Sequence, residues 1–297
     1  MKLLTKEDAK NSNKLIVLYG PPKVGKSIAA CTISEYCPPV IPAKESTTLT
    51  DILVINYDRD GRLSYDNTNL YPYFVDYFGA YALNTEIDPT LPTSKRALET
   101  AAIAERGKAL CKTMISDLFN TINEAVKNPD IKTIVIDTLS SFEEQYRRCY
   151  DPFASLDGKE LGAQTYLTLS AIAARLVDIH HKNVIVVCHA KASEAYVHGK
   201  ADEEKLEKAA LKREVASVGG SGSFVSPALQ KNSAALFGKH ATFLFYVFRK
   251  EKDPEKGKRL FLTRSDSGYE AGNKIENGLL PEEPANLRAI LKKANLI

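Results

Sequence analysis

This chain is organised around the octapeptide Gly20-Pro21-Pro22-Lys23-Val24-Gly25-Lys26-Ser27. An apolar run, Leu15–Tyr19, precedes it, and we expect a helix after it, from Ser27 to about Tyr36. The octapeptide matches the pattern G-x-x-x-x-G-K-[ST], which has meaning when a strand comes before the loop and a helix comes after it. The sequence therefore predicts an α/β fold in which the first strand leads into a glycine loop.

The chemistry of this loop needs these residue types at this spacing. Gly20 and Gly25 let the backbone turn so that successive N–H groups point at phosphate oxygens, and the following helix adds the positive end of its dipole. Lys26 is placed to reach the β- and γ-phosphates of a nucleotide, and the Ser27 hydroxyl is placed to bind Mg²⁺. We predict that all eight residues bind a nucleotide, against the alternative of an ordinary strand-to-helix turn.

The composition sets the broad class of protein. The chain has 297 residues, of which 44% are hydrophobic and 26% are charged, as is typical of a globular protein. We expect a single domain over residues 1–297. The net charge of +3 comes from 40 basic and 37 acidic side chains, so a contact with nucleic acid would have to depend on a local patch.

The cysteines and the apolar runs of the sequence indicate the cellular compartment of the protein and whether it spans a membrane. The five cysteines are odd in number and form no C-x-x-C pair, so we expect buried, reduced thiols and neither a disulfide framework nor a zinc site. Residues 1–13 are charged and lack the apolar segment of a signal peptide. No apolar run approaches the length that spans a membrane. These features predict a cytoplasmic protein with no membrane partner.

Three further runs, 51–58, 132–138 and 183–189, predict strands. The run 132–138 is β-branched without alternation, which is typical of a parallel strand buried on both faces. Asp58 and His189 are the last residues of the first and third runs, and Asp137 is the last residue but one of the second. Because ligands of open α/β sheets bind beyond the carboxyl ends of the strands, we expect these side chains and Ser27 to lie together.

Each of these polar groups has a candidate role. Asp137 stands where a P-loop protein places the carboxylate that holds Mg²⁺ through water. His189 is predicted to sense the γ-phosphate, and a purely structural histidine is the alternative. Glu143 and Glu144 lie just beyond Asp137. We favour surface charges for both over a water-positioning role.

The remaining pattern completes an α/β chain. Helices are predicted over 94–126, 166–180 and 284–294, and an antiparallel hairpin over 241–248 and 258–263. The expected buried stripe of the first helix is Leu98, Ala101, Ile103, Leu110, Met114, Leu118, Ile122 and Val126. A cluster of six tyrosines is favoured as wall and core residues, although aromatic rings can also stack on bases. They are Tyr57, Tyr65, Tyr71, Tyr73, Tyr77 and Tyr81.

The segment 190–240 differs in composition from the rest. It is rich in Lys, Glu and Ala up to Val215 and then contains Gly219-Gly220-Ser221-Gly222-Ser223. This composition predicts a long flexible loop. The loop is either a solvated insertion or a mobile arm that contacts a polymer backbone or a neighbouring subunit.

The order of these motifs resembles the RecA-like ATPase core, and in particular the small phage-encoded RecA-like ATPases, which include single-strand annealing and recombination proteins. The residues that carry the resemblance are 20–27, 133–137 and 184–191, and it spans roughly 14–285. The tail 271–281 looks like a degenerate form of the family's A-K-[DN]-R…L-P ending.

The resemblance implies further roles. Asp58 matches the catalytic carboxylate that polarises the attacking water, where the family has Glu, and Asp60 is the alternative. His189 matches a sensor that links hydrolysis to a DNA-binding loop, which places contacts to single-stranded DNA in 190–237. Lys274 matches a lysine that acts on a neighbouring subunit's nucleotide, although the arginine expected after it is absent.

These observations lead to one preferred reading and two alternatives. The preferred hypothesis is an Mg²⁺-dependent ATPase of RecA-like fold that acts on single-stranded DNA in phage recombination, annealing or replication. If the protein is phage-encoded, it would act in the host cytoplasm. A homo-oligomer is one possible state. Lys26, Asp58, Asp137 and His189 would be its catalytic residues. The alternatives are an ATP-switched module that binds a protein and no nucleic acid, and a small-molecule kinase with 190–237 as its lid.

Overall fold

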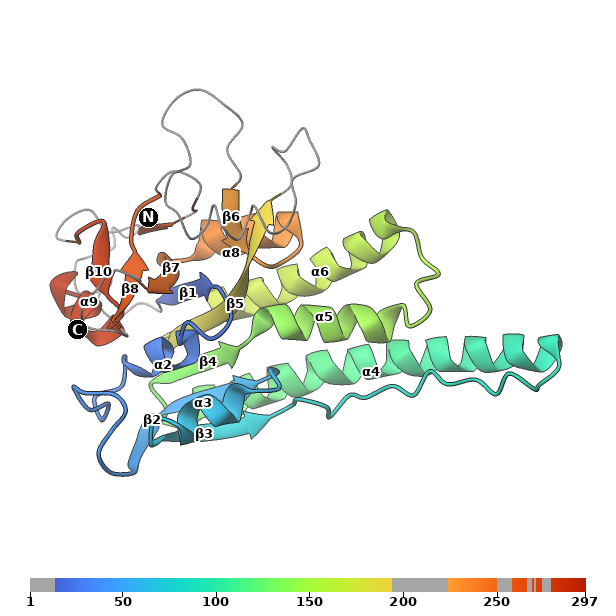
Figure 1. Ribbon diagram of the computed structural model, residues 1–297, viewed down its shortest axis with the longest axis horizontal. Coiled ribbons are helices and arrows are strands. Elements are labelled where there is room, and N and C mark those ends of the chain that lie inside the picture. Colours follow the sequence, from blue (N-terminus) through green and yellow to red (C-terminus); the bar gives the residue numbers. More distant parts are fainter. Residues whose placement is uncertain (1–13, 194–223, 250–257, 266–268, 270, 274–278) are drawn as a thin grey trace, which may run out of the picture.

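A computed structural model describes residues 14–193, 224–249, 258–265, 269, 271–273 and 279–297. Its ten strands form one sheet with helices on both faces (Figure 1). The strands are β1 (Leu15–Gly20), β2 (Thr47–Asn56), β3 (Leu70–Asp76), β4 (Thr133–Asp137), β5 (Asn183–Ser193), β6 (Phe224–Pro227), β7 (Phe243–Arg249), β8 (Arg259–Leu262), β9 (Gly272–Asn273) and β10 (Glu282–Pro284). The helices are α2 (Lys26–Cys31), α3 (Gly61–Asp66), α4 (Thr93–Lys127), α5 (Leu139–Tyr150), α6 (Gly158–Val177), α8 (Lys231–His240) and α9 (Leu287–Lys293).

The sheet is mostly parallel. Its strand order is β10-β8-β7-β1-β5-β4-β2-β3, and the six strands from β7 to β3 are parallel to one another. β8 pairs antiparallel with β7, and β10 pairs antiparallel with β8. β6 and β9 add short antiparallel pairings to β5 and β7. A parallel sheet extended by an antiparallel C-terminal hairpin is therefore confirmed.

The core lies on both faces of the sheet. In β1, Leu15, Val17 and Tyr19 pack on the face covered by α4, α5, α6 and α8. Ile16 and Leu18 point the other way, toward α2, α3 and α9. Helices on both faces leave the central strands no polar side, which is why their sequences show no alternation.

Strand register brings the carboxyl ends of the central strands into line. Gly20 of β1 pairs with His189 of β5, Asp137 of β4 pairs with Val187 of β5, and Asn56 of β2 pairs with Asp137. β5 continues to Ser193, past the predicted end at His189. The predicted strands therefore reach one edge of the sheet together.

Two predicted helices have different bounds. α2 ends at Cys31 rather than near Tyr36, because the Ser34 hydroxyl donates to Asp51 Oδ1 (2.5 Å) and Thr32 bonds back to the carbonyl of Ala29 (2.6 Å). Such side-chain bonds compete with helix continuation. α6 starts at Gly158 rather than Tyr166, because the Asp157 carboxylate caps the two N–H groups of Lys159 and Glu160.

α4 confirms the predicted long helix but only part of its buried stripe. Ile103, Met114, Leu118 and Ile122 are buried, whereas Leu98 is 72% exposed. The N-terminal part of the helix extends beyond the sheet, so it has no core to face there (Figure 1). Neither this 35-residue helix nor any other helix in the described part of the chain is apolar enough to cross a membrane.

Regular structure also occurs where none was expected. The strand β3 and the helices α3 and α5 are absent from the sequence-based prediction. The segment 190–240, expected as one long loop, begins in β5 and contains β6 and α8, and its residues 194–223 lie outside the described part of the chain.

The tyrosine cluster divides between core and surface. Tyr57, Tyr65 and Tyr81 are buried, as predicted for core residues. Tyr71 and Tyr73 are 39% and 47% exposed, because they lie on β3 at the edge of the sheet. The prediction of wall and core residues is therefore wrong for these two.

Candidate functional site

The glycine loop needs both of its glycines. Gly25 has φ 92° and ψ 36°, in the left-handed region that favours glycine. A Cβ on Gly20 would overlap the carbonyl oxygen of Val247 in the neighbouring strand β7. The loop thus turns sharply against β7 and starts α2 at Lys26.

Lys26 is almost fully buried, with 6% of its surface exposed. Its Nζ donates to the carbonyl oxygens of Gly20 (3.0 Å) and Pro21 (2.8 Å). Burial lowers the pKa of Lys26, and the negative charges of Asp137 and Asp58 oppose this shift. Both carboxylates therefore lie close enough to the ammonium to act on it.

Asp137 lies at the end of β4 and is 1% exposed. Its Oδ2 accepts a hydrogen bond from the Tyr65 hydroxyl (3.2 Å), whereas its buried Oδ1 has no hydrogen-bond partner among the described residues. Burial raises the pKa of Asp137; the nearby Ser27 hydroxyl and the Lys26 charge lower it, and the Asp58 charge raises it further. This carboxylate therefore lies beside the loop serine and the loop lysine.

Asp58 follows β2 on a turn that the Asn56 side chain holds. Asn56 Oδ1 accepts the Asp58 N–H (3.2 Å), and Asn56 Nδ2 donates to the Asp58 carbonyl (2.8 Å) and to Asp76 Oδ1 (2.9 Å). A Cβ on Gly61 would overlap Asn56 Oδ1, so only glycine fits at the start of α3. Asp60, the alternative candidate, is exposed and lies at the N-cap of α3.

His189 faces Asp58 across the edge of the sheet. Its Nε2 lies 4.0 Å from Asp58 Oδ2, and its backbone N–H donates to the Ser140 hydroxyl (3.1 Å). Burial and then the Lys26 charge lower the pKa of His189, and the Asp58 charge opposes them. The buried Nδ1 has no hydrogen-bond partner in the part of the chain that the structure describes.

Glu143 and Glu144 differ from each other. Glu144 is exposed and pairs with Arg148, as expected of a surface charge. Glu143 is 6% exposed, so its prediction as a surface charge is wrong. It accepts the backbone N–H of Gln230 (3.0 Å) and thereby ties α5 to the segment before α8.

Two site residues were not found from the sequence. The sequence identifies Tyr65 only as one of six tyrosines, and Arg259 only as part of a strand. Arg259 lies against Gly25, since its Nε is 2.5 Å from the point where a Cβ on that glycine would sit. Lys274 lies outside the described residues, and so do residues 194–223 of the region 190–237 in which the resemblance places the DNA contacts.

The residues present fit a hard cation such as Mg²⁺. Carboxylate and hydroxyl oxygens suit this ion, which keeps several of its waters when bound. Asp137 Oδ1 is buried and has no partner at hydrogen-bond geometry among the described residues, and the Ser27 hydroxyl lies near the same carboxylate. A buried acceptor of this kind calls for a water or an ion beside it.

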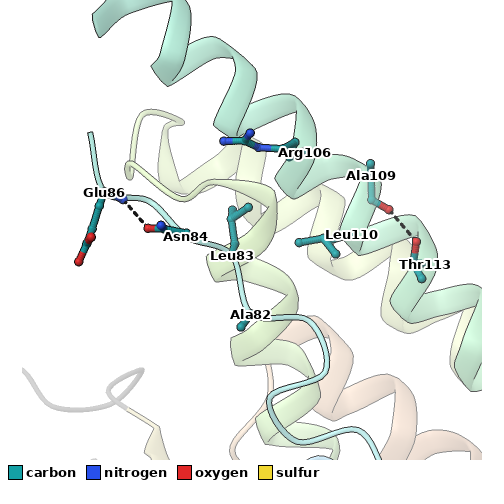
Figure 2. A pocket seen from close by; sticks show the side chains of 8 residues that line it. All are labelled: Ala82, Leu83, Asn84, Glu86, Arg106, Ala109, Leu110 and Thr113. Carbon is teal, nitrogen blue, oxygen red and sulfur yellow. Dashed lines mark hydrogen bonds between the residues drawn. The ribbon is translucent and has the colours of Figure 1, made fainter. Parts of the chain in front are cut away.

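A separate pocket of about 560 Å³ lies between α4 and the segment 82–86 (Figure 2). Its lining residues are Ala82, Leu83, Asn84, Glu86, Arg106, Ala109, Leu110 and Thr113. None of them belongs to the predicted site. Within the pocket wall, Asn84 Oδ1 accepts the Glu86 N–H (2.9 Å) and the Thr113 hydroxyl bonds the Ala109 carbonyl (3.2 Å), so these groups are already partnered.

No family model and no curated protein matches the chain. Among solved structures, it is similar to an ATPase domain, at 10% identity and a TM-score of 0.37, over 91% of this chain and 79% of that one. It is also similar to the RadB recombinase, at 11% identity and a TM-score of 0.35, over 87% of this chain and 85% of that one.

The arrangement defines the fold class. A glycine loop follows the first strand of a mostly parallel sheet, helices cover both faces, and an antiparallel hairpin extends the C-terminal side. This is the mostly parallel α/β sheet with a C-terminal antiparallel hairpin that was expected from the sequence.

Proposed function

We propose that the protein is an Mg²⁺-dependent ATPase that acts on single-stranded DNA in recombination, annealing or replication. The observation that carries the proposal is the convergence of Lys26, Asp137 and Asp58 at the carboxyl edge of the sheet. Strand register aligns Gly20 with His189 and Asn56 with Asp137, and the Asp58 carboxylate lies 4.0 Å from His189. Three different strands deliver these groups, so the arrangement is a product of the fold rather than of local sequence.

The glycine loop would bind the triphosphate. Its backbone N–H groups and the Lys26 ammonium offset negative charge on the β- and γ-phosphates. Ser27 and, through water, Asp137 would hold Mg²⁺. When bound, this ion would neutralise charge on the phosphate oxygens. The Tyr65 hydroxyl fixes which way the Asp137 carboxylate faces.

Asp58 would orient the water that attacks the γ-phosphate. We favour it over Asp60 because its carboxylate lies at the edge of the sheet beside His189, where its charge also acts on Lys26 and Asp137. Asp60 is exposed at the cap of α3. His189 lies 4.0 Å from the Asp58 carboxylate and would sense the γ-phosphate, transmitting its presence to the chain that follows β5.

The proposed DNA contact depends on that following chain. β5 runs from the site to Ser193, and the sequence beyond it carries Lys200, Lys205, Lys208 and Lys212. Lysines near a polymer backbone supply sequence-independent affinity for phosphates. Contact of His189 with the γ-phosphate would thus be coupled to the binding of single-stranded DNA.

The test is ATP turnover with and without single-stranded DNA over a series of salt concentrations. We expect turnover to be stimulated by DNA, and the stimulation to fall steeply with salt because counterions are released on binding. Lys26→Ala should abolish turnover and keep the wild-type circular dichroism spectrum. Lys112→Ala, an exposed lysine of α4, is the matched control.

Other outcomes identify the alternatives. ATP binding without any effect of DNA would favour an ATP-switched protein-binding module. Turnover that appears only with a small-molecule acceptor would favour a kinase. Turnover at the wild-type rate in Lys26→Ala would show that the site is assigned wrongly.

A further inference from the structure

The C-terminal hairpin places an arginine on the glycine loop. Arg259 opens β8, two strands away from β1 in the sheet. Its Nε and Cδ lie 2.5 and 2.9 Å from the point where a Cβ on Gly25 would sit. The arginine side chain therefore covers the side of Gly25 on which another residue would carry its side chain.

The charge of this arginine has no counterpart in the described part of the chain. Its Nε is buried without a hydrogen-bond partner, and neither Arg259 nor Arg249 forms an ion pair with the described residues. The two arginines are directly opposed across the β7–β8 pair. Burial, and then the Arg249 charge, lowers the pKa of Arg259.

Such an arrangement is unfavourable by itself. Like charges directly opposite each other in a sheet are destabilising, and the buried, unpartnered Nε of the half-buried Arg259 also costs stability. An anion beside the two arginines would offset both costs. Guanidinium groups match phosphate oxygens with paired N–H donors, which makes phosphate the anion that suits them.

We infer that Arg259, with Arg249 beside it, binds the phosphates of the nucleotide held by the glycine loop. This inference rests on the proposed function, because the loop supplies the nucleotide. It adds a second element of the same chain, the β7–β8 hairpin, to the phosphate site. A purely structural role, in which the aliphatic stem of Arg259 covers Gly25, is the alternative.

Calorimetric binding of ATP and of inorganic tripolyphosphate, in the presence of Mg²⁺, tests the inference without relying on turnover. Arg259→Gln should weaken both ligands by about 10- to 100-fold, the loss expected of a charged hydrogen bond. Arg259→Lys should lose less. Arg148→Gln removes a charge from an exposed ion pair on α5 and should bind both ligands as the wild type does.

The melting temperature without ligand separates binding from structure. Because the Nε of Arg259 is buried and has no hydrogen-bond partner among the described residues, Arg259→Gln should melt at the wild-type temperature or above it. A lower melting temperature with unchanged affinity for ATP would give Arg259 a structural role and overturn the inference. Weaker binding of ATP with unchanged binding of tripolyphosphate would place the contact on the base and also overturn it.

The failure of the inference and that of the proposed function differ in outcome. If the wild type binds ATP, Lys26→Ala weakens it and Arg259→Gln does not, the inference fails and the proposed function stands. If the wild type binds neither ATP nor tripolyphosphate, the proposed function itself fails.

Discussion

Tyr65 donates its hydroxyl hydrogen to Oδ2 of Asp137 over 3.2 Å, and both side chains are buried. The two residues are 72 positions apart in the chain and come from α3 and β4. The bond occupies one oxygen of the carboxylate and leaves Oδ1 without a partner among the described residues. Tyr65 is therefore a positioning residue for the carboxylate that we assign to Mg²⁺.

Tyr65→Phe should loosen Mg²⁺ binding without removing the fold. Loss of an outer partner of a metal site typically lowers metal affinity by about 10- to 100-fold, and the lost hydrogen bond should cost roughly 1 kcal/mol of stability. The Mg²⁺ concentration that gives half-maximal ATP turnover measures the effect. Tyr73→Phe, on the exposed edge strand, is the control. An unchanged Mg²⁺ requirement in Tyr65→Phe would contradict the positioning role.

Asp58→Asn should reduce ATP turnover by about 100-fold or more, because an amide cannot orient and polarise the attacking water as a carboxylate does. ATP affinity should be unchanged or higher, since a negative charge near the phosphates is removed. Asp60→Asn is the matched control and should keep turnover. Single-turnover rates with equilibrium binding separate the two effects, and the opposite ranking of the two variants would transfer the role to Asp60.

Much of the fold and part of the site could be predicted from the sequence. The glycine loop, β4 and β5 are local patterns: a motif with its flanks, and apolar runs whose lack of alternation reports burial on both faces. Asp137 and His189 follow from these runs, because strand ends in a parallel sheet meet at one edge.

Other elements give weak local signals. α3 is only six residues long, which is too short to show a helical pattern. In β3, the exposed Tyr71 and Tyr73 obscure the pattern of a strand. α5 is an exception, because Leu139, Phe142 and Tyr146 stand at helical spacing after a Thr138 cap, a pattern from which a helix can be predicted.

The contacts of Tyr65 and Arg259 could not be predicted from the sequence. The first depends on how α3 packs on the sheet, and the second depends on the register of β8 against β7, which pairs Arg259 with Arg249. Neither is encoded in residues near the glycine loop. Long-range packing decided both.

Gly61→Ala should destabilise the protein by about 1–3 kcal/mol, the usual cost of forcing an extra methyl into a filled site. The new Cβ would overlap Asn56 Oδ1, which holds the Asp58 turn. Gly158→Ala is the control, because nothing lies within 4 Å of a Cβ there, and it should be neutral or stabilising by up to about 1 kcal/mol. Urea unfolding measures both. Equal stabilities of the two variants would contradict the packing argument.

Asp137→Asn should stabilise the ligand-free protein at neutral pH, because the site holds a desolvated carboxylate. Burial raises the pKa of Asp137 above its ordinary value of 3.8. When a folded-state pKa is raised, the protonated form is favoured by folding, so the wild type loses stability as pH rises through that pKa. An asparagine at position 137 is neutral at every pH, so the variant does not lose this stability.

The stability that Asp137→Asn gains over the wild type should therefore increase as pH rises. It should be full above the raised pKa of Asp137, shrink as pH falls through it, and vanish below the ordinary value of 3.8, where the wild-type carboxyl is protonated in both states. Free energies of unfolding of wild type and variant between neutral and acid pH measure it, with the exposed Asp66→Asn as control. A variant less stable than the wild type at neutral pH would mean that Lys26 and the neighbouring hydroxyls outweigh the cost of burying the carboxylate.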